Sequence, residues 1–207
     1  MSFRESFQHH DALLAAAIDA FVTSGFEGAS LSAILATARM SKGQFYHHFR
    51  DKEDLYLGVC EAMIDRKRAW FEAHPVPIAD DPFQALAAEL RAGLAFAKAN
   101  PDLDAFGRAF LRERGRPIFA AALQRFSFSD SPGLGGVLAR GFANQSFHPA
   151  FSPKFVVRAL STVLTAAGDL LDAETPEQLE AGLNELITFL RRGLGADGVT
   201  PPGSPSR

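Results

Sequence analysis

The stretch from residue 30 to residue 52 most constrains what this chain can fold into, because it holds two short helical patterns separated by a tight turn. Ser30 is suited to cap a first helix that ends at Ala38, and its inward face is predicted to consist of Leu31, Ile34 and Leu35. Ser41 is placed to cap a second helix that ends near Phe49. This spacing predicts a helix-turn-helix with Met40 as the apolar plug between the two helices.

The side chains of the second helix divide into an inward and an outward set. Phe45 and Phe49 are four residues apart, so they share one face and anchor the helix. The outward side chains can hydrogen-bond to base edges and phosphates, with Gln44 expected to read adenine and Lys52 to bind a phosphate. Gly43 is expected to allow close approach of the backbone to DNA. The predicted DNA-binding residues are Ser30, Ser41, Lys42, Gly43, Gln44, Tyr46, His47, His48 and Lys52.

From Ser41 to Leu55 the sequence Ser-Lys-Gly-Gln-Phe-Tyr-His-His-Phe-Arg-Asp-Lys-Glu-Asp-Leu resembles the signature of the tetracycline-repressor (TetR/AcrR) family of transcriptional regulators. Upstream, Ala16-Ala17, Phe21 and Gly25-Phe26 resemble the first helix of that family. The resemblance implies an all-helical homodimer that binds double-stranded operator DNA, of palindromic sequence, through N-terminal three-helix domains. It also implies a repressor that releases the operator when a small-molecule effector enters the C-terminal domain, and it does not identify that effector.

Two residues depart from the family pattern. Arg39 stands where the family usually has glycine, in a turn that commonly needs a left-handed residue, and this is expected to cost about 1 kcal/mol. Leu35 stands where the family commonly has a small residue, so the packing between the two short helices is expected to shift slightly.

Charge and cysteine usage limit the classes of function. A net charge of -3 is not that of a protein that coats nucleic acid indiscriminately, so DNA binding is expected to depend on direct readout. The single cysteine, Cys60, cannot form an intrachain disulfide and is expected to be a buried thiol in a reducing cytoplasm. The sequence has no recognisable secretory signal and no run long enough to cross a bilayer, so a cytoplasmic location without a membrane partner is predicted.

The rest of the chain also shows helical spacing, and the predicted fold class is all-α. A long helix from residue 52 to about residue 74 ends at Pro75 and Pro77, and further helices are expected over residues 82–99, 102–112, from 117 to about 126, 134–143, 153–171 and 176–193, with a turn-rich stretch over 127–136. The predicted division is a helix-turn-helix DNA-binding domain over residues 1–54, a helical regulatory and dimerisation domain over 55–195 and a disordered tail over 196–207. Residues before about His9 are expected to form a frayed arm.

Two groups of apolar residues in the C-terminal domain are candidate contact sites. Aromatic rings at helical spacing are most simply core, but they also suit a pocket for an apolar or aromatic effector, lined by Trp70, Phe96, Phe106, Phe110 and Phe119. The last two helices are expected to pair with those of a second subunit as a four-helix bundle, through Phe155, Leu160, Val163, Leu164, Leu183, Leu186, Ile187 and Leu190.

Two other classes of function compete with a transcriptional regulator. A helical enzyme using His74, His148 and acidic residues of the C-terminal domain finds no support, because His148 has no visible catalytic partner and no nucleotide-binding, hydrolase or zinc motif is present. The chain is therefore expected not to be an enzyme and to need no metal or cofactor. An interaction module that no longer reads DNA is favoured by Arg39 and by the excess of acidic residues within residues 1–54.

Overall fold

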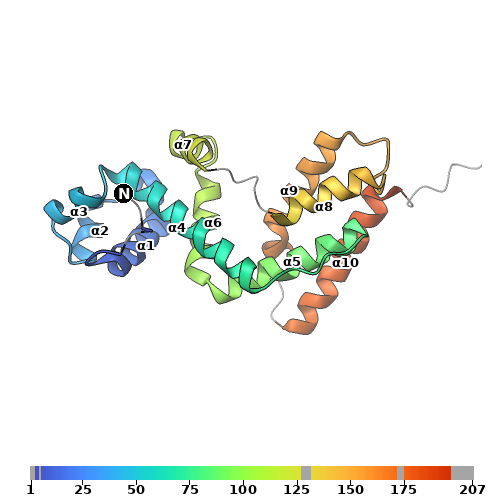
Figure 1. Ribbon diagram of the computed structural model, residues 1–207, viewed down its shortest axis with the longest axis horizontal. Coiled ribbons are helices and arrows are strands. Elements are labelled where there is room, and N and C mark those ends of the chain that lie inside the picture. Colours follow the sequence, from blue (N-terminus) through green and yellow to red (C-terminus); the bar gives the residue numbers. More distant parts are fainter. Residues whose placement is uncertain (1–2, 5, 127–131, 172–174, 197–207) are drawn as a thin grey trace, which may run out of the picture. The chain divides into compact units, whose positions relative to one another are not determined.

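The computed structural model describes residues 3–4, 6–126, 132–171 and 175–196. The regular secondary structure of these residues is helical, which confirms the all-α prediction (Figure 1). The helices are α1 (His10–Gly28), α2 (Leu31–Thr37), α3 (Lys42–His48), α4 (Lys52–Ala73), α5 (Pro82–Ala99), α6 (Pro101–Arg112), α7 (Pro117–Arg125), α8 (Pro132–Ala143), α9 (Pro153–Leu171) and α10 (Pro176–Leu194). Within the described ranges, no helix has the length and apolar character needed to cross a membrane.

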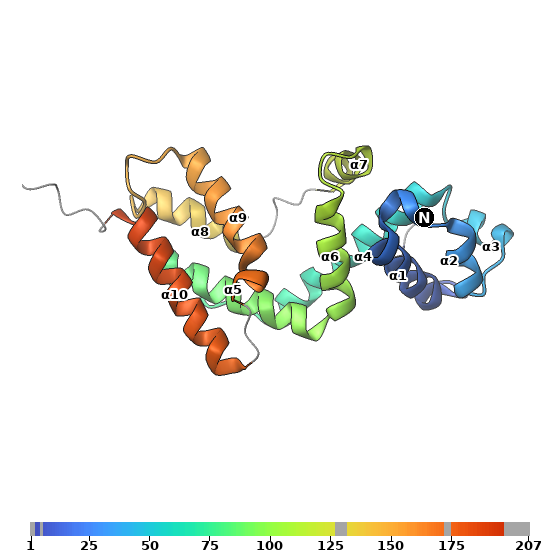
Figure 2. The ribbon, with the colours of Figure 1, turned by 180° about the vertical axis from the view of Figure 1, so that it is seen from behind.

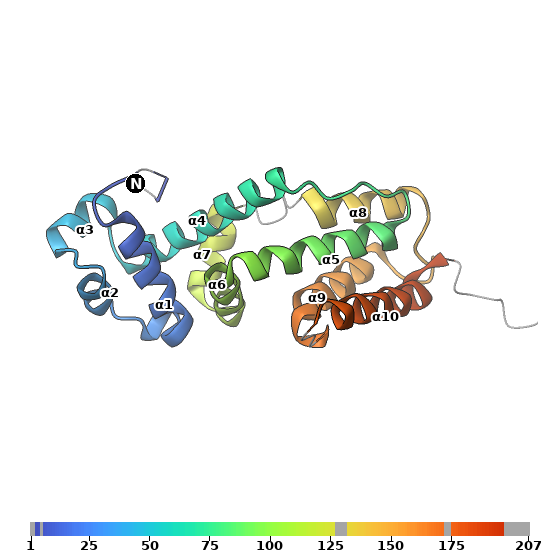
Figure 3. The ribbon, with the colours of Figure 1, turned by 90° about the horizontal axis from the view of Figure 1, so that it is seen from below.

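The chain divides into two compact units. Unit 1 comprises Met1–Ala73 and Phe96–Phe128, and unit 2 comprises His74–Ala95 and Ser129–Arg207. Within unit 1, α6 lies against α1 (Figure 2), and within unit 2, α9 and α10 lie side by side (Figure 3). This division differs from the predicted boundary at residue 54, because α4, α6 and α7 belong to the same unit as the N-terminal helices.

The C-terminal end of α1 is held by α6. Gly25 adopts a φ of 68° and a ψ of 176°, so α1 is interrupted at this glycine. Beyond this kink the Phe26 N–H donates to Oε1 of Glu113, over 2.9 Å. Glu113 is 3% exposed, and Arg116 pairs with its other carboxylate oxygen at 3.0 Å. A buried carboxylate from the end of α6 therefore takes up an N–H that the kink leaves without a helical partner.

The N-terminal arm, residues 3–9, is docked rather than frayed in its described residues. Phe3 is 8% exposed, and its ring centroid lies 5.0 Å from that of Phe49. Arg4 donates to both carboxylate oxygens of Asp65 on α4, at 2.7 and 3.0 Å. The expectation of a solvated tail was wrong because aromatic residues at positions 3 and 7 give the arm apolar surface to bury.

The core of unit 2 contains part of the predicted dimer interface. Four of its residues are at most 6% exposed and pack within the unit: Leu160, Leu183, Leu186 and Leu190. Val163, Leu164 and Ile187 are half-buried against the same core, and only Phe155 of the predicted set is exposed, at 51%. The four leucines therefore pack inside unit 2, and their part in a dimer interface stays a prediction. Helical spacing marks the apolar face of α9 and α10 without indicating which surface it covers.

The five aromatic residues of the predicted effector pocket belong to the hydrophobic core of unit 1. Phe106 is fully buried, and its ring lies 5.4 Å from that of Tyr56. The rings of Phe110 and Phe119 are tilted, with centroids 4.8 Å apart, and the ring of Trp70 lies 6.1 Å from that of Phe96. Their contacts are those of packed side chains, so the pocket stays a prediction.

Several smaller predictions can be compared with the described residues. Cys60 is fully buried, as expected, and burial raises the pKa of its thiol to about 12. Helix α8 begins at Pro132, so residues 133–136 are helical where a turn was predicted. Thr175 caps α10 and forms a reciprocal pair of hydrogen bonds with Gln178. Of the predicted tail, Ala196 donates its N–H to the Ser146 carbonyl, and residues 197–207 lie outside the described part of the chain.

Candidate nucleic-acid interface

Two capped helices and a strained turn build the helix-turn-helix. The Ser30 hydroxyl accepts from the Ala33 N–H at the start of α2, over 3.4 Å. Ser41 caps α3 by accepting from the Gln44 N–H at 3.2 Å, while Gln44 Oε1 accepts from the Ser41 N–H at 2.9 Å. The sequence predicted both caps. They fix where each helix begins, and this sets which side chains of α3 face outward.

The turn between α2 and α3 has the left-handed residue that the sequence predicted. Arg39 has a φ of 53°, and the Met40 N–H returns to the Leu35 carbonyl at 2.9 Å. Met40 is 6% exposed and fills the space between the helices, as predicted. Phe45 and Phe49 anchor α3, with 0% and 2% exposure and ring centroids 5.7 Å apart.

The outward face of α3 presents fewer free groups than its sequence suggests. Lys42, Gly43, Tyr46 and His47 are exposed, with Tyr46 at 58%. A side-chain carbon added at Gly43 would have only the Ser41 hydroxyl oxygen within contact range, at 4.0 Å, so the backbone there is open to a ligand. These residues form the accessible part of the predicted DNA-binding set.

The other predicted contact residues also have partners inside the protein. Gln44 and the two serines take part in helix caps. His48 is half-buried and stacks on Phe7, with ring centroids 4.1 Å apart. Hydroxyls and amides keep further hydrogen-bonding capacity, so these residues stay candidates for DNA contact, but each would act from a position fixed by the fold.

Lys52 holds the end of α1. Its ammonium group donates to the Glu27 and Ala29 carbonyls, both at 3.1 Å, and lies 4.7 Å from the centre of the Phe26 ring. An ammonium has three donors, so one remains for a phosphate. The predicted phosphate contact at Lys52 is therefore compatible with the structure but shares its charge with a helix C-terminus.

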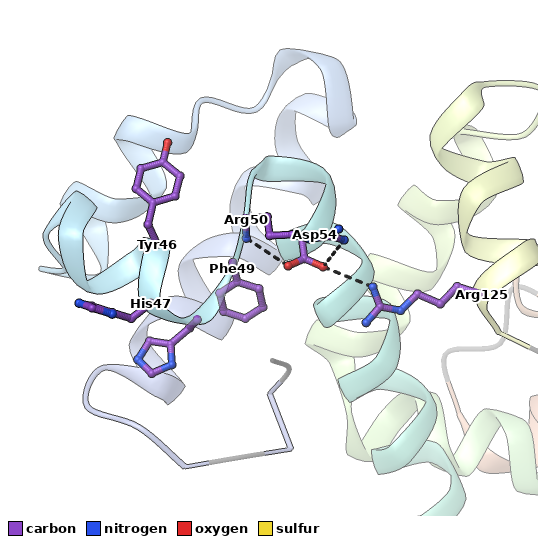
Figure 4. Close-up of a pocket in the computed structure, with 7 residues that line it drawn as sticks. Tyr46, His47, Phe49, Arg50, Asp54 and Arg125 are labelled. Atoms are coloured by element: carbon purple, nitrogen blue, oxygen red, sulfur yellow. Dashed lines mark hydrogen bonds and ion pairs between the residues drawn. The ribbon is translucent and has the colours of Figure 1, made fainter.

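A cluster of charged groups beside α3 was missed by sequence reasoning. Asp54 accepts from the Arg50 N–H at 3.1 Å and from the guanidinium groups of Arg50 and Arg125, both at 3.3 Å (Figure 4). Burial alone would raise the pKa of Asp54, but these three hydrogen bonds outweigh it and hold that pKa below its usual value. Arg50 and Asp54 are four residues apart and could have been recognised as a pair, whereas Arg125 lies on α7, far along the chain.

Comparison with known proteins finds a family match that includes the helix-turn-helix. Residues 13–59 match the model of the family described as bacterial regulatory proteins, tetR family. The chain is 27% identical over 203 residues to the HTH-type transcriptional regulator TcmR of Streptomyces glaucescens, covering 92% of this chain and 86% of that regulator. It is 38% identical over 53 residues to the transcriptional regulator AcuR of Cereibacter sphaeroides, a match that spans 26% of this chain but only 24% of AcuR.

Solved structures share the fold. A TetR family transcriptional regulator from Chloroflexus aurantiacus superimposes with a TM-score of 0.72 at 23% identity, over 93% of this chain and 96% of that chain. The similarity therefore extends through both compact units, beyond the N-terminal residues that match the family model.

Proposed function

We infer from its membership of the tetR family of bacterial regulatory proteins that the chain regulates transcription and is not an enzyme. We propose that it is a repressor, which acts as a homodimer on a palindromic operator in the cytoplasm. The observation that carries the proposal is the geometry of α3, which two caps and two buried phenylalanines hold with Lys42, Tyr46 and His47 exposed. An exposed helix of this kind suits the major groove, where side-chain donors and acceptors can distinguish base pairs.

The interaction-module alternative rested on Arg39 and on the acidic N-terminal residues. The α2–α3 turn accommodates Arg39 without loss of either helix cap. The acidic residue Asp54 is paired with two arginines, so it does not present an isolated negative charge beside α3. We therefore favour DNA reading over an interaction module.

The test is binding to a duplex taken from the region upstream of the chain's own gene, compared with a scrambled duplex of equal length. Lys42→Ala is expected to reduce the ratio of the two affinities by a factor that corresponds to about 1–3 kcal/mol, because removing a base-edge contact affects only the specific complex. Glu72→Ala, at an exposed position near the end of α4, is the matched control and should leave the ratio unchanged. Equal affinity of the wild type for both duplexes would contradict the proposal.

We propose that the homodimer forms through the outer faces of α9 and α10. On α10 the exposed residues recur every three or four positions, at Ala181, Asn184, Glu185, Thr188, Phe189 and Arg192, and the last five of these line a hollow of about 450 Å³. Phe189 and Leu170 are 69% and 61% exposed. Large apolar side chains left in water favour burial against a second subunit. A two-fold pairing would place two copies of α3, the proposed reader helix, on one palindrome.

An effector that releases the operator is the remaining part of the proposal. Of the candidate residues, Trp70 and Phe119 are half-buried and could line a site that opens on binding, whereas Phe106 lies in the closed core. A ligand must prefer the DNA-incompetent state in order to act. Trp70 is the single tryptophan, so a fluorescence change that coincides with loss of the operator complex would support this, and a change without that loss would not.

A further inference from the structure

A surface hollow of about 330 Å³ lies beside the reader helix and includes a residue from outside the helix-turn-helix. Its lining combines the end of α3, the start of α4 and the last residue of α7, in the form of Tyr46, His47, His48, Phe49, Arg50, Asp54 and Arg125. Figure 4 shows Asp54 between the two arginines, with Tyr46 and His47 projecting from α3. All of these elements belong to unit 1.

The three charged groups of the hollow leave an excess of positive charge. One carboxylate, that of Asp54, faces two guanidinium groups, and the lowered pKa of Asp54 means that it stays ionised at neutral pH. The next carboxylate in this region, that of Asp51, accepts from the Asp54 N–H at 2.8 Å and caps the start of α4. Asp51 and Glu53 also act on Arg50 through their charges. The ion-pair cluster of Arg50, Asp54 and Arg125 by itself carries a formal charge of about +1.

Burial is unequal within this cluster. The Asp54 side chain is 7% exposed, whereas the side chains of Arg50 and Arg125 are 81% and 36% exposed. A guanidinium has five N–H donors, and each arginine uses one of them on the Asp54 carboxylate. The buried carboxylate thus holds two cations in place, and each of them keeps N–H donors that Asp54 does not use.

We propose that Arg125, together with Arg50, binds a backbone phosphate of the DNA duplex, so that the DNA-contacting surface includes α7. Guanidinium groups suit phosphate because their planar donors match its oxygens in pairs. The hollow shares Tyr46 and His47 with the exposed face of α3, so a duplex whose major groove receives α3 brings its flanking backbone to this place. This inference rests on the proposed DNA-binding function.

The test compares wild type with Arg125→Ala on the upstream duplex and on the scrambled duplex over a range of salt concentrations. Loss of one phosphate contact should weaken binding to both duplexes by the same factor and reduce the slope of log K against log salt by about 0.9. Arg125→Lys keeps the charge and should recover most of the slope. Arg114→Ala removes an equal charge from the exposed α6–α7 turn, outside the hollow, and should leave the slope at the wild-type value.

A second measurement separates phosphate binding from a purely structural role for Arg125 in holding Asp54. Duplexes that carry a single neutral methylphosphonate are scanned across the backbone flanking the recognised groove. At one position the modification should reduce the affinity of the wild type by the same factor as the Arg125→Ala substitution does. The same modification should not reduce the affinity of the Arg125→Ala variant any further. An unchanged salt slope in Arg125→Ala, or additive losses at every position, would overturn the inference.

Two further outcomes are distinguishable. If the wild type binds neither duplex, the proposed function fails before this inference is reached. If inorganic phosphate at constant ionic strength competes with wild-type binding but not with that of Arg125→Ala, the hollow takes a free anion and the DNA-phosphate assignment is overturned. The inference predicts that phosphate has no effect beyond that of ionic strength.

Discussion

Arg39 is the residue at which the helix-turn-helix stores backbone strain. Its φ of 53° lies in the left-handed region, which costs a residue with a side-chain carbon about 1–2 kcal/mol. The side chain is exposed and the Arg39 N–H bonds to the Ala36 carbonyl at 3.1 Å, so the turn itself is well formed. The strain therefore lowers the stability of the helix-turn-helix but does not distort its geometry.

Replacing Arg39 with glycine should therefore stabilise the protein by up to about 1 kcal/mol, the relief of strain being partly offset by the greater freedom of glycine in the unfolded chain. Ala36→Gly, at an exposed position in α2, should destabilise by about 1 kcal/mol and serves as the control of opposite sign. Urea unfolding midpoints measure both. A destabilised Arg39→Gly variant would mean that the arginine side chain makes a compensating contact.

Local sequence predicted the helix caps but not the side-chain contacts between residues distant in the chain. The caps at Ser30, Ser41 and Thr175 were predictable because a cap depends on residues only three positions apart. The partners of Lys52 and Asp54 were not, because they lie at positions 27, 29 and 125, brought close only by the fold. Sequence patterns therefore identified the reader helix but overestimated how many of its polar groups are free.

The N-terminal arm is an element whose structure depends on contacts distant in sequence. Besides the Phe3–Phe49 contact, Phe7 stacks on His48, so the arm touches the C-terminal end of α3. Gly58 on α4 makes room for it, since an added side-chain carbon there would lie 2.8 Å from the Phe49 ring and 3.3 Å from the Phe3 ring. The arm thus helps to fix α3 against α4.

Phe3→Ala should destabilise the protein by about 2–4 kcal/mol, because it removes a buried ring and leaves a cavity. Arg4→Ala should cost much less despite two short hydrogen bonds, because that arginine side chain is 59% exposed and the pair is screened by water. Denaturant unfolding measures the difference between the two variants. Equal losses would indicate that the ion pair, rather than the ring, holds the arm.

At the scale of the whole molecule, helix periodicity predicted the helical segments well, but it did not predict which surfaces their apolar faces cover. Apolar residues on α9 and α10 were assigned to a dimer interface, yet Leu183 and Leu186 fill the core of unit 2. Both a core and an interface use the same residue types at the same spacing, so only the packing of α5 and α8 against these helices separates the two roles. The exposed residues of α10, among them Phe189, could be identified only from the exposed fraction of each side chain.

Phe189→Glu should dissociate the proposed dimer while leaving each subunit folded, because the side chain is 69% exposed in one chain. Leu183→Glu should unfold unit 2, since a charge would be buried in its core. Sedimentation velocity at micromolar concentration, with circular dichroism for helix content, distinguishes the two outcomes. A dimeric Phe189→Glu variant would move the interface elsewhere.

The bond between Glu113 and the Phe26 N–H has a consequence for anyone who recombines regulators to exchange their DNA specificity. A cut after residue 54 would transplant α3 without the carboxylate that the kink of α1 requires, and the half-buried Phe26 N–H would lose its partner. Unit 1 is built from two separate stretches of chain. The transferable cassette is therefore discontinuous, and a working chimaera needs α6 and α7 grafted together with the N-terminal helices.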